Sequence, residues 1–202
     1  MTGNNHSHPT HMLTMPNPIR QNRRTAYEGA LSFEAFLAGV RVNEQLWTAL
    51  ARRASVSDRL VRQARAIPGS WHLLALVEDW CGDAVNTLPV LSRLVEQAPH
   101  ITLRVLKRDD HPDLMDAHLT HGKRAIPIMM VLDDEFREVA WWGPRPAYLQ
   151  DWATTLGMTL SKPDRYRELR RWYAVDRGQS TVREVLRLMC QASGAACERD
   201  AA

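Results

Sequence analysis

The side chain with the clearest chemical potential is Cys81, which lies in the segment VEDWCGDA at residues 77–84. An apolar run at residues 71–77 precedes it and a helical pattern follows at residues 83–97, so Cys81 is expected between a buried strand and a helix. Unpaired backbone N–H groups and the helix macrodipole stabilise a thiolate there. Gly82 leaves room for a thiol partner beside the sulfur. The pattern predicts a nucleophilic cysteine whose sulfur is exposed to solvent.

Asp83 bears on this thiol in two ways. As the second residue after the cysteine, its carboxylate can accept hydrogen bonds from backbone N–H groups in the first turn of the helix, and we expect this capping role to be its main one. Its negative charge near the sulfur also raises the thiol pKa and so opposes the helix dipole. We therefore expect a moderately reactive thiol rather than a strongly acidic one.

Two further cysteines, Cys190 and Cys197, are candidates to resolve a disulfide on Cys81. Cys190 shares a helical face with apolar residues, which favours a buried thiol, whereas Cys197 lies on a short polar tail after Gly194. Three cysteines cannot form a fully paired disulfide scaffold. We therefore expect reduced thiols and a cytoplasmic location.

The elements that must position Cys81 follow from the apolar patterns. Strands are expected at 71–77, 101–106, 128–132 and 137–142, and helices at 83–97, 112–119 and 147–156. This order predicts an α/β fold, a mixed four-stranded sheet with helices on both faces. We expect a disordered tail at 1–26, an N-terminal helical extension at 27–70, the core at 71–160 and a C-terminal helical extension at 161–202. A capping box at Thr181–Glu184 is expected to begin the last helix.

Composition narrows the classes of function. The chain has 202 residues, with 26 basic and 23 acidic side chains, a balance that does not call for nucleic acid as a partner. No apolar run approaches the roughly 20 residues of a membrane span, and no secretory signal is recognisable. His6, His8 and His11 are expected to be solvated rather than to bind a metal. A cluster of polar residues is expected to serve a turn rather than a cation: Asp109, Asp110, His111, Asp113 and His118. An aromatic and proline corner is expected to pack near Cys81: Trp141, Trp142, Pro144, Arg145 and Pro146.

Four features resemble the thioredoxin family over roughly residues 71–160. They are the triplet Trp80-Cys81-Gly82, Pro89 within the following helix, the Ile126-Pro127 pair before an apolar strand, and Gly143 after the last strand. The resemblance implies that Cys81 is the attacking cysteine and that Trp80 shields it. It also implies that Pro127 follows a cis peptide bond and that the Ile126 backbone pairs with an extended thiol substrate. The substrate groove would then comprise Trp80, Gly82, Asp83, Ile126 and Pro127.

The departures from the family pattern matter equally. Ala84 stands where the family has the second cysteine of Cys-x-x-Cys, so Cys81 cannot close a disulfide with a neighbouring thiol. Ala75 stands where thioredoxins have a buried acid. Dithiol reduction by this motif is therefore excluded. The combination of WCGD, RDD-x-P-D-L-M, I-P and WGPRP resembles a bacterial subgroup with helical additions at both ends.

Three functions remain open. The first is a monothiol thiol–disulfide oxidoreductase, in which Cys81 forms a mixed disulfide with a protein or a low-molecular-weight thiol and an external thiol resolves it. The second is a redox-inactive module that binds a protein or peptide in the proline groove. The third, an iron–sulfur cluster bridged between two chains, is disfavoured because no glutathione-binding surface is recognisable. We expect no cofactor, no membrane, no nucleic acid and no metal, and we leave a homodimer open.

Overall fold

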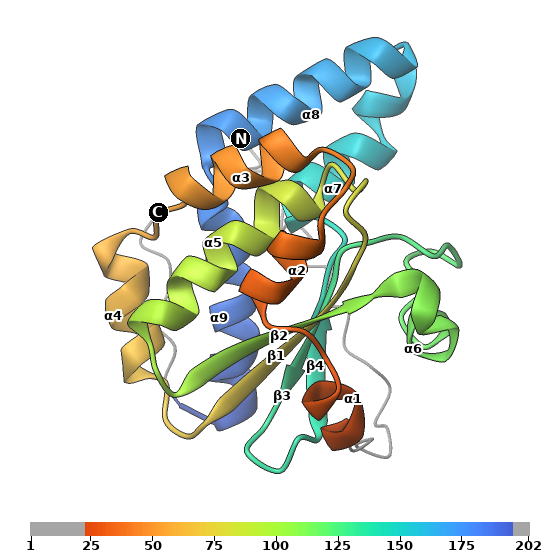
Figure 1. Cartoon of the computed structure of the whole chain (residues 1–202). Helices are drawn as coiled ribbons and strands as arrows, with labels where there is room; N and C mark the ends of the chain where they lie inside the picture. Colours follow the sequence, from red (N-terminus) through yellow and green to blue (C-terminus); the bar gives the residue numbers. More distant parts are fainter. Residues whose placement is uncertain (1–22, 196–202) are drawn as a thin grey trace, which may run out of the picture.

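The structure, a computed structural model, describes residues 23–195, so His6, His8, His11 and Cys197 lie outside the described residues. Its centre is a four-stranded sheet in the order β2-β1-β3-β4 (Figure 1). The strands are β1 (Trp71–Val77), β2 (Ile101–Lys107), β3 (Ile128–Leu132) and β4 (Glu138–Trp142). β1 pairs parallel with β2 and antiparallel with β3, and β4 pairs antiparallel with β3. The mixed sheet predicted from the sequence is confirmed.

The central strands are apolar along their length because helices and loops cover them. All five residues of β3 are buried, and in β1 only His72 is partly exposed. One face carries α5 (Ala84–Gln97) and α9 (Gln179–Ser193), which pack on each other, α5 against β2 and α9 against β3 and β4. The connection from β1 through α5 to the parallel strand β2 therefore places the start of α5 at the carboxyl end of β1, where Cys81 lies.

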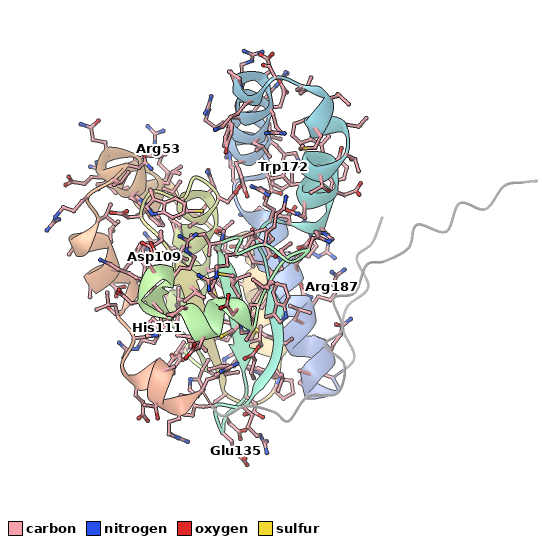
Figure 2. All side chains as sticks on the ribbon, turned by 90° about the vertical axis from the view of Figure 1, so that its right-hand side faces the viewer. Arg53, Asp109, His111, Glu135, Trp172 and Arg187 are labelled. Atoms are coloured by element: carbon pink, nitrogen blue, oxygen red, sulfur yellow. The ribbon has the colours of Figure 1, made fainter. Side chains whose placement is uncertain are left out.

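The remaining helices lie before and after this core. The N-terminal ones are α1 (Arg24–Glu28), α2 (Phe33–Gly39), α3 (Glu44–Arg53) and α4 (Asp58–Ala66), and the others are η1 (Arg108–Asp110), α6 (Pro112–Asp116), α7 (Ala147–Thr154), η2 (Leu156–Thr159) and α8 (Lys162–Asp176). α7 and α8 project beyond the sheet (Figure 1), and Trp172 lies in this arm, at the opposite end of the molecule from Glu135 (Figure 2). The arm has an apolar cluster of its own, formed by Leu149, Ala153, Leu169 and Tyr173.

Three sequence predictions need correction at the ends of elements. Residues 24–26, predicted within a disordered tail, form the first turn of α1. α6 ends at Asp116, earlier than predicted, because the chain turns there towards the buried His118. The capping box at Thr181 does not form: α9 begins at Gln179, and the Glu184 carboxylate instead accepts hydrogen bonds from Trp142 Nε1 (2.7 Å) and Ala147 N (2.9 Å).

Gly178, between α8 and α9, is required by both backbone and space. Its φ of +76° favours glycine, and a Cβ at this position would lie 2.4 Å from Val90 Cγ1 on α5. The turn between α8 and α9 therefore packs directly against α5, the helix that follows Cys81. None of the helices among residues 23–195 has the length and apolar character to cross a membrane.

Candidate functional site

Cys81 lies between β1 and α5, as predicted. Its thiol donates a hydrogen bond to the carbonyl oxygen of Ile126 (3.4 Å), and its Sγ accepts one from the Ala84 N–H (3.4 Å). The fold thus brings the first turn of α5 and the loop before β3 to the same sulfur. The prediction that this sulfur is exposed to solvent is wrong, because Cys81 is only 6% exposed. The loop before β3 covers the sulfur through the Ile126 carbonyl oxygen. The sequence analysis places this loop near Cys81 but does not reveal how closely it packs on the sulfur.

Burial also changes the acidity of this thiol. Removal from water, followed by the negative charge of Asp83, raises the pKa of Cys81 to about 11. The backbone N–H groups of Ala84 and Asp83 and the Arg145 guanidinium act in the opposite direction but are weaker. At pH 7 only about 1 in 10,000 thiols is ionised at such a pKa. The thiol is therefore less reactive than the sequence led us to expect.

Asp83 does not cap α5 with its side chain. Its carboxylate instead forms a two-point ion pair with Arg145, with Nη2–Oδ2 at 2.6 Å and Nε–Oδ1 at 3.0 Å. The Tyr173 hydroxyl on α8 donates a further hydrogen bond to Oδ1 (2.9 Å). The capping prediction is wrong because these long-range partners outcompete the local N–H groups. Burial raises the pKa of Asp83, and Arg145 opposes that rise.

Two proline loops meet beside Cys81. The Ile126–Pro127 and Gly143–Pro144 peptide bonds are both cis. Gly143 has a φ of +136°, and a Cβ at this position would lie 2.1 Å from the carbonyl oxygen of Pro127. No other residue type fits this contact without movement of one loop. The loop after β4 is thereby fixed against the loop that covers the thiol, and it directs Arg145 towards Asp83.

The residues before Cys81 are held by the N-terminal extension. The carbonyl oxygen of Asp79 accepts a hydrogen bond from Trp47 Nε1 (2.8 Å) on α3, and its carboxylate accepts from the backbone N–H groups of Arg41 (2.8 Å) and Val42 (3.0 Å). Trp80 follows and is 46% exposed. The Arg108 guanidinium carbon lies 4.9 Å from the centre of its ring. Trp80 therefore precedes the thiol in the chain with its ring partly exposed to solvent and partly covered by Arg108.

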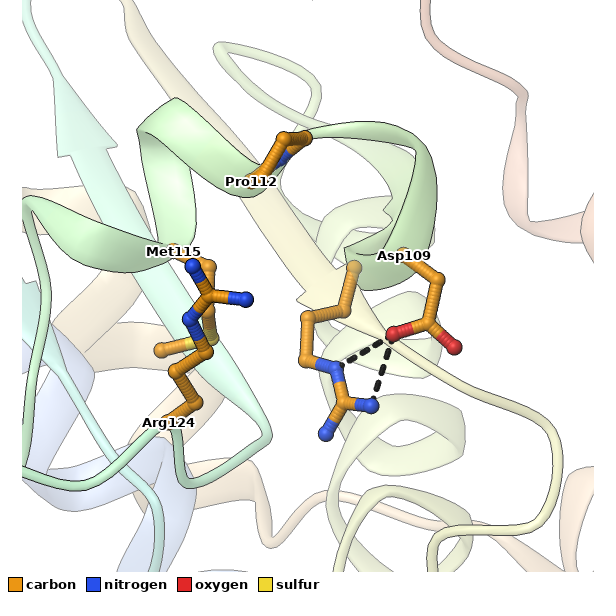
Figure 3. Close-up of a pocket in the computed structure, with 5 residues that line it drawn as sticks. Asp109, Pro112, Met115 and Arg124 are labelled. Carbon is orange, nitrogen blue, oxygen red and sulfur yellow. Dashed lines mark hydrogen bonds and ion pairs between the residues drawn. The ribbon is translucent and has the colours of Figure 1, made fainter.

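A pocket of about 230 Å³ is lined by Arg108, Asp109, Pro112, Met115 and Arg124, and Arg108 also stacks on Trp80. In Figure 3, Arg124 and Met115 lie on one side of the opening and Asp109 lies on the other. Four of the five lining residues belong to the RDDHPDLM segment at residues 108–115, for which the sequence analysis predicted a turn and the start of a helix but no pocket.

The other predicted site residues divide in two. Gly82, Asp83, Ile126 and Pro127 are gathered around Cys81. Cys190 lies in the last turns of α9 and is disulfide-bonded, so the expectation of reduced thiols is wrong for this cysteine. Cys81 is a free thiol, so these two cysteines are not bonded to each other. Among residues 23–195, no group of three or more histidine, cysteine or acidic side chains could hold a metal ion.

The sequence analysis assigned His118 to a polar turn, but the structure buries this side chain. His118 Nδ1 lies 2.6 Å from the Leu114 carbonyl oxygen and Nε2 lies 2.6 Å from Glu138 Oε1, while Arg23 Nε donates to Glu138 Oε2 (2.8 Å). Burial alone would raise the pKa of Glu138, but His118 and Arg23 hold it below its usual value. This network ties β4 to the segment that carries the pocket.

The chain was compared with protein families, with curated proteins and with solved structures. A family model described as Thioredoxin matches residues 30–159. A protein of unknown function from Pseudomonas aeruginosa superposes with a TM-score of 0.70 at 21% identity, over 85% of this chain and 99% of that one. An HIV epitope scaffold superposes with a TM-score of 0.68 at 21% identity, over 87% and 100% of the two chains. No curated protein matches the chain. The two structural likenesses concern the fold alone.

Proposed function

The chain belongs to the thioredoxin family, and from this premise we propose that it performs monothiol thiol–disulfide exchange through Cys81. The observation that carries the proposal is the placement of Cys81, a free thiol at the start of α5 whose sulfur lies 3.4 Å from the Ile126 carbonyl oxygen. A substrate disulfide that replaces this contact would reach the sulfur along the proline loop. Ala84 provides no second thiol, so the mixed disulfide must be resolved from outside.

The proposed reaction has two balanced steps. In the first, the Cys81 thiolate attacks one sulfur of a disulfide RSSR, the S–S bond breaks, and the departing thiolate takes up the proton that Cys81 released. In the second, an external thiolate R′S⁻ attacks the RS sulfur of the mixed disulfide, the bond to the Cys81 sulfur breaks, and Cys81 takes up the proton of R′SH while the disulfide RSSR′ leaves. The net change over these two steps is conversion of RSSR and one R′SH to RSH and RSSR′, and exchange of RSSR′ with a further R′SH in solution releases the second RSH and forms R′SSR′. No metal or cofactor enters this balance.

The burial of Cys81 sets the pace of this reaction. Because the thiol pKa is raised to about 11, the thiolate fraction at any lower pH increases about tenfold per pH unit. Exchange is therefore slow at neutral pH and accelerates steadily into the alkaline range. A substrate that brings a positive charge or a hydrogen-bond donor to the sulfur would favour the thiolate in the bound state.

The proposal is tested by intact-mass measurement after incubation with 2-hydroxyethyl disulfide at several pH values between about 7 and 10. We expect one adduct on the native chain, none on Cys81→Ser, and removal of the adduct by an external thiol. Cys190 is disulfide-bonded in the native chain, so it carries no free thiol that could form an adduct of its own. Absence of an adduct on the native chain throughout this range would end the proposal.

A second candidate function is a redox-inactive module that binds a protein or peptide along the proline loop. The observation that favours it is the 6% exposure of Cys81 together with its raised pKa, since both restrain thiol chemistry. The two candidates differ in their dependence on sulfur. A binding module keeps its partner affinity in Cys81→Ala, whereas an exchange protein retains its substrate as a covalent mixed disulfide that the variant cannot form.

A further inference from the structure

The pocket beside Trp80 has the chemistry of a small-molecule site. Its volume of about 230 Å³ is below that of sites for drug-sized ligands, which run from about 300 Å³ upwards. It therefore suits one end of a small molecule. Met115, which is only 1% exposed, and Pro112 provide apolar surface, while Arg108, Arg124 and Asp109 provide polar groups.

Two arginines of the pocket are connected to the immediate neighbours of Cys81. Arg108 stacks over Trp80, the residue directly before Cys81. Arg124 is two residues before Ile126, whose carbonyl oxygen contacts the thiol. One arginine of the pocket therefore stacks on the residue before Cys81, and the other belongs to the loop whose carbonyl oxygen contacts the sulfur. Glu78, which directly follows β1, ties the pocket to the segment before Cys81, because its Oε1 accepts a hydrogen bond from the Asp109 N–H (2.9 Å).

The polar groups of the pocket are only partly used within the chain. Arg108 donates Nε and Nη2 to Asp109 Oδ1 (2.8 and 2.6 Å), and Arg124 donates Nε and Nη2 to Asp116 (2.7 and 2.6 Å). Among residues 23–195, the structure gives no hydrogen-bond partner to Nη1 of either arginine or to Asp109 Oδ2. The pocket thus offers guanidinium donors and a carboxylate acceptor at the same time.

The charge of this group selects the kind of ligand. Arg108 and Arg124 are matched by Asp109 and Asp116, so the pocket carries no net charge and attracts neither a simple anion nor a simple cation at long range. Its directed donors fit a planar carboxylate, and its free carboxylate oxygen fits an ammonium group. A ligand that carries a carboxylate and an ammonium group on the same carbon satisfies both the donors and the acceptor.

We propose that the pocket lined by Arg108, Asp109 and Arg124 binds the α-amino acid end of a low-molecular-weight thiol or disulfide. The carboxylate binds between the arginine Nη1 groups, the ammonium binds Asp109, and the side-chain methylene lies on Met115 and Pro112. The binding step stands by itself. The identification of the ligand as a thiol or disulfide rests on the proposed function of Cys81.

Binding is tested with Cys81→Ser, which removes all covalent chemistry. Three probes are titrated by NMR of the tryptophan indole N–H groups: S-methyl-L-cysteine, its methyl ester, and N-acetyl-S-methyl-L-cysteine. The first carries both charges, the second only the ammonium and the third only the carboxylate. We expect about millimolar affinity for the first and at least about fivefold weaker binding of the other two.

Variants connect this preference to the pocket. Arg124→Gln is expected to weaken S-methyl-L-cysteine at least about fivefold, and Asp109→Asn is expected to abolish its advantage over the N-acetyl compound. Arg171→Gln, on the exposed surface of α8, is the matched control and is expected to leave binding unchanged. Equal affinities for the three probes, equal effects of Arg124→Gln and Arg171→Gln, or no saturation by about 50 mM would each overturn the proposal.

A kinetic comparison separates this proposal from that of thiol exchange. On the native chain, Cys81 is expected to react at least about fivefold faster with cystine than with the neutral 2-hydroxyethyl disulfide, and Arg124→Gln is expected to remove that ratio. If Cys81 reacts with both disulfides equally, the pocket does not select the substrate and the proposal is overturned. If Cys81 reacts with neither while S-methyl-L-cysteine still binds as described, thiol exchange fails and the binding site stands.

Discussion

The charge of Asp83 offers the most direct test of how the structure controls its thiol. Asp83 lies two residues after Cys81, in a pair with Arg145 that is largely shielded from water. Asp83→Asn removes the negative charge, retains the shape of the side chain and keeps an oxygen that can accept from Tyr173. The positive charge of Arg145 remains. The lost negative charge and the retained positive charge of Arg145 both favour the thiolate, so the pKa of Cys81 is expected to fall.

The size of this fall follows from Coulomb's law. For an assumed separation of about 6.5 Å and an effective dielectric constant of about 20, two unit charges interact by about 2.5 kcal/mol, or about 2 pKa units. Partial release of Arg145 towards solvent in the variant reduces this to about 1.5 units. The pKa of Cys81 should therefore fall from about 11 to roughly 9.5. The thiolate fraction then rises about 30-fold below that pH, but the weaker base is about fivefold less nucleophilic, which leaves a net gain of about sixfold.

The assay is the rate of alkylation of Cys81 by iodoacetamide as a function of pH, followed on the Cys81 peptide by mass spectrometry. Asp79→Asn is the matched control, because Asp79 lies two residues before Cys81 and its carboxylate is directed to the backbone of Arg41 and Val42. It should change the rate by less than about twofold, since water screens this more exposed charge. A slower Asp83→Asn, or an equal gain in both variants, would refute this account of the thiol.

Three other perturbations test the surroundings of the site. Gly143→Ala should lower the free energy of unfolding by at least about 2 kcal/mol in denaturant melts, because its Cβ would collide with the neighbouring proline loop at a φ of +136°; an unchanged midpoint would contradict the contact. Tyr173→Phe should cost about 1.5 kcal/mol through the lost hydrogen bond to a buried carboxylate, whereas Tyr166→Phe, on the exposed side of α8, should cost almost nothing. The lowered pKa of Glu138 contributes stability that is present above its ordinary value of 4.5 and is lost as pH falls through the lower folded value; Glu138→Gln should flatten thermal stability between about pH 5 and pH 3, and a parallel pH profile in the variant would count against the network.

The sheet and the position of Cys81 could be predicted because they depend on local patterns. Runs such as WHLLALV and IMMVL are apolar at every position, which is typical of strands covered on both faces. The helix after Cys81 follows from the regular spacing of its leucines and valines. The order of these elements then restricts the topology to a few choices.

The electrostatics of the site could not be predicted in the same way. Asp83 at a helix start and Glu184 in a capping box both match local rules, yet each binds partners from distant segments: Arg145 and Tyr173 for Asp83, and Trp142 for Glu184. A buried partner wins over a backbone N–H that water can satisfy equally well. Sequence patterns describe neighbours along the chain, so they do not reveal these choices.

The helices after the matched family region are part of the site rather than an attachment to it. The family model ends at residue 159, but Tyr173 on α8 binds the carboxylate beside the thiol, and Glu184 on α9 binds the loop that carries Arg145. The local energetics of Cys81 therefore depend on three segments, namely its own helix, the loop after β4 and the C-terminal arm. A thiol restrained in this way responds to anything that shifts the arm, because release of Tyr173 or Arg145 changes the charge beside the sulfur. Burial of the sulfur and the negative charge of Asp83 raise the pKa of Cys81, although the backbone N–H groups at this helix start favour its thiolate.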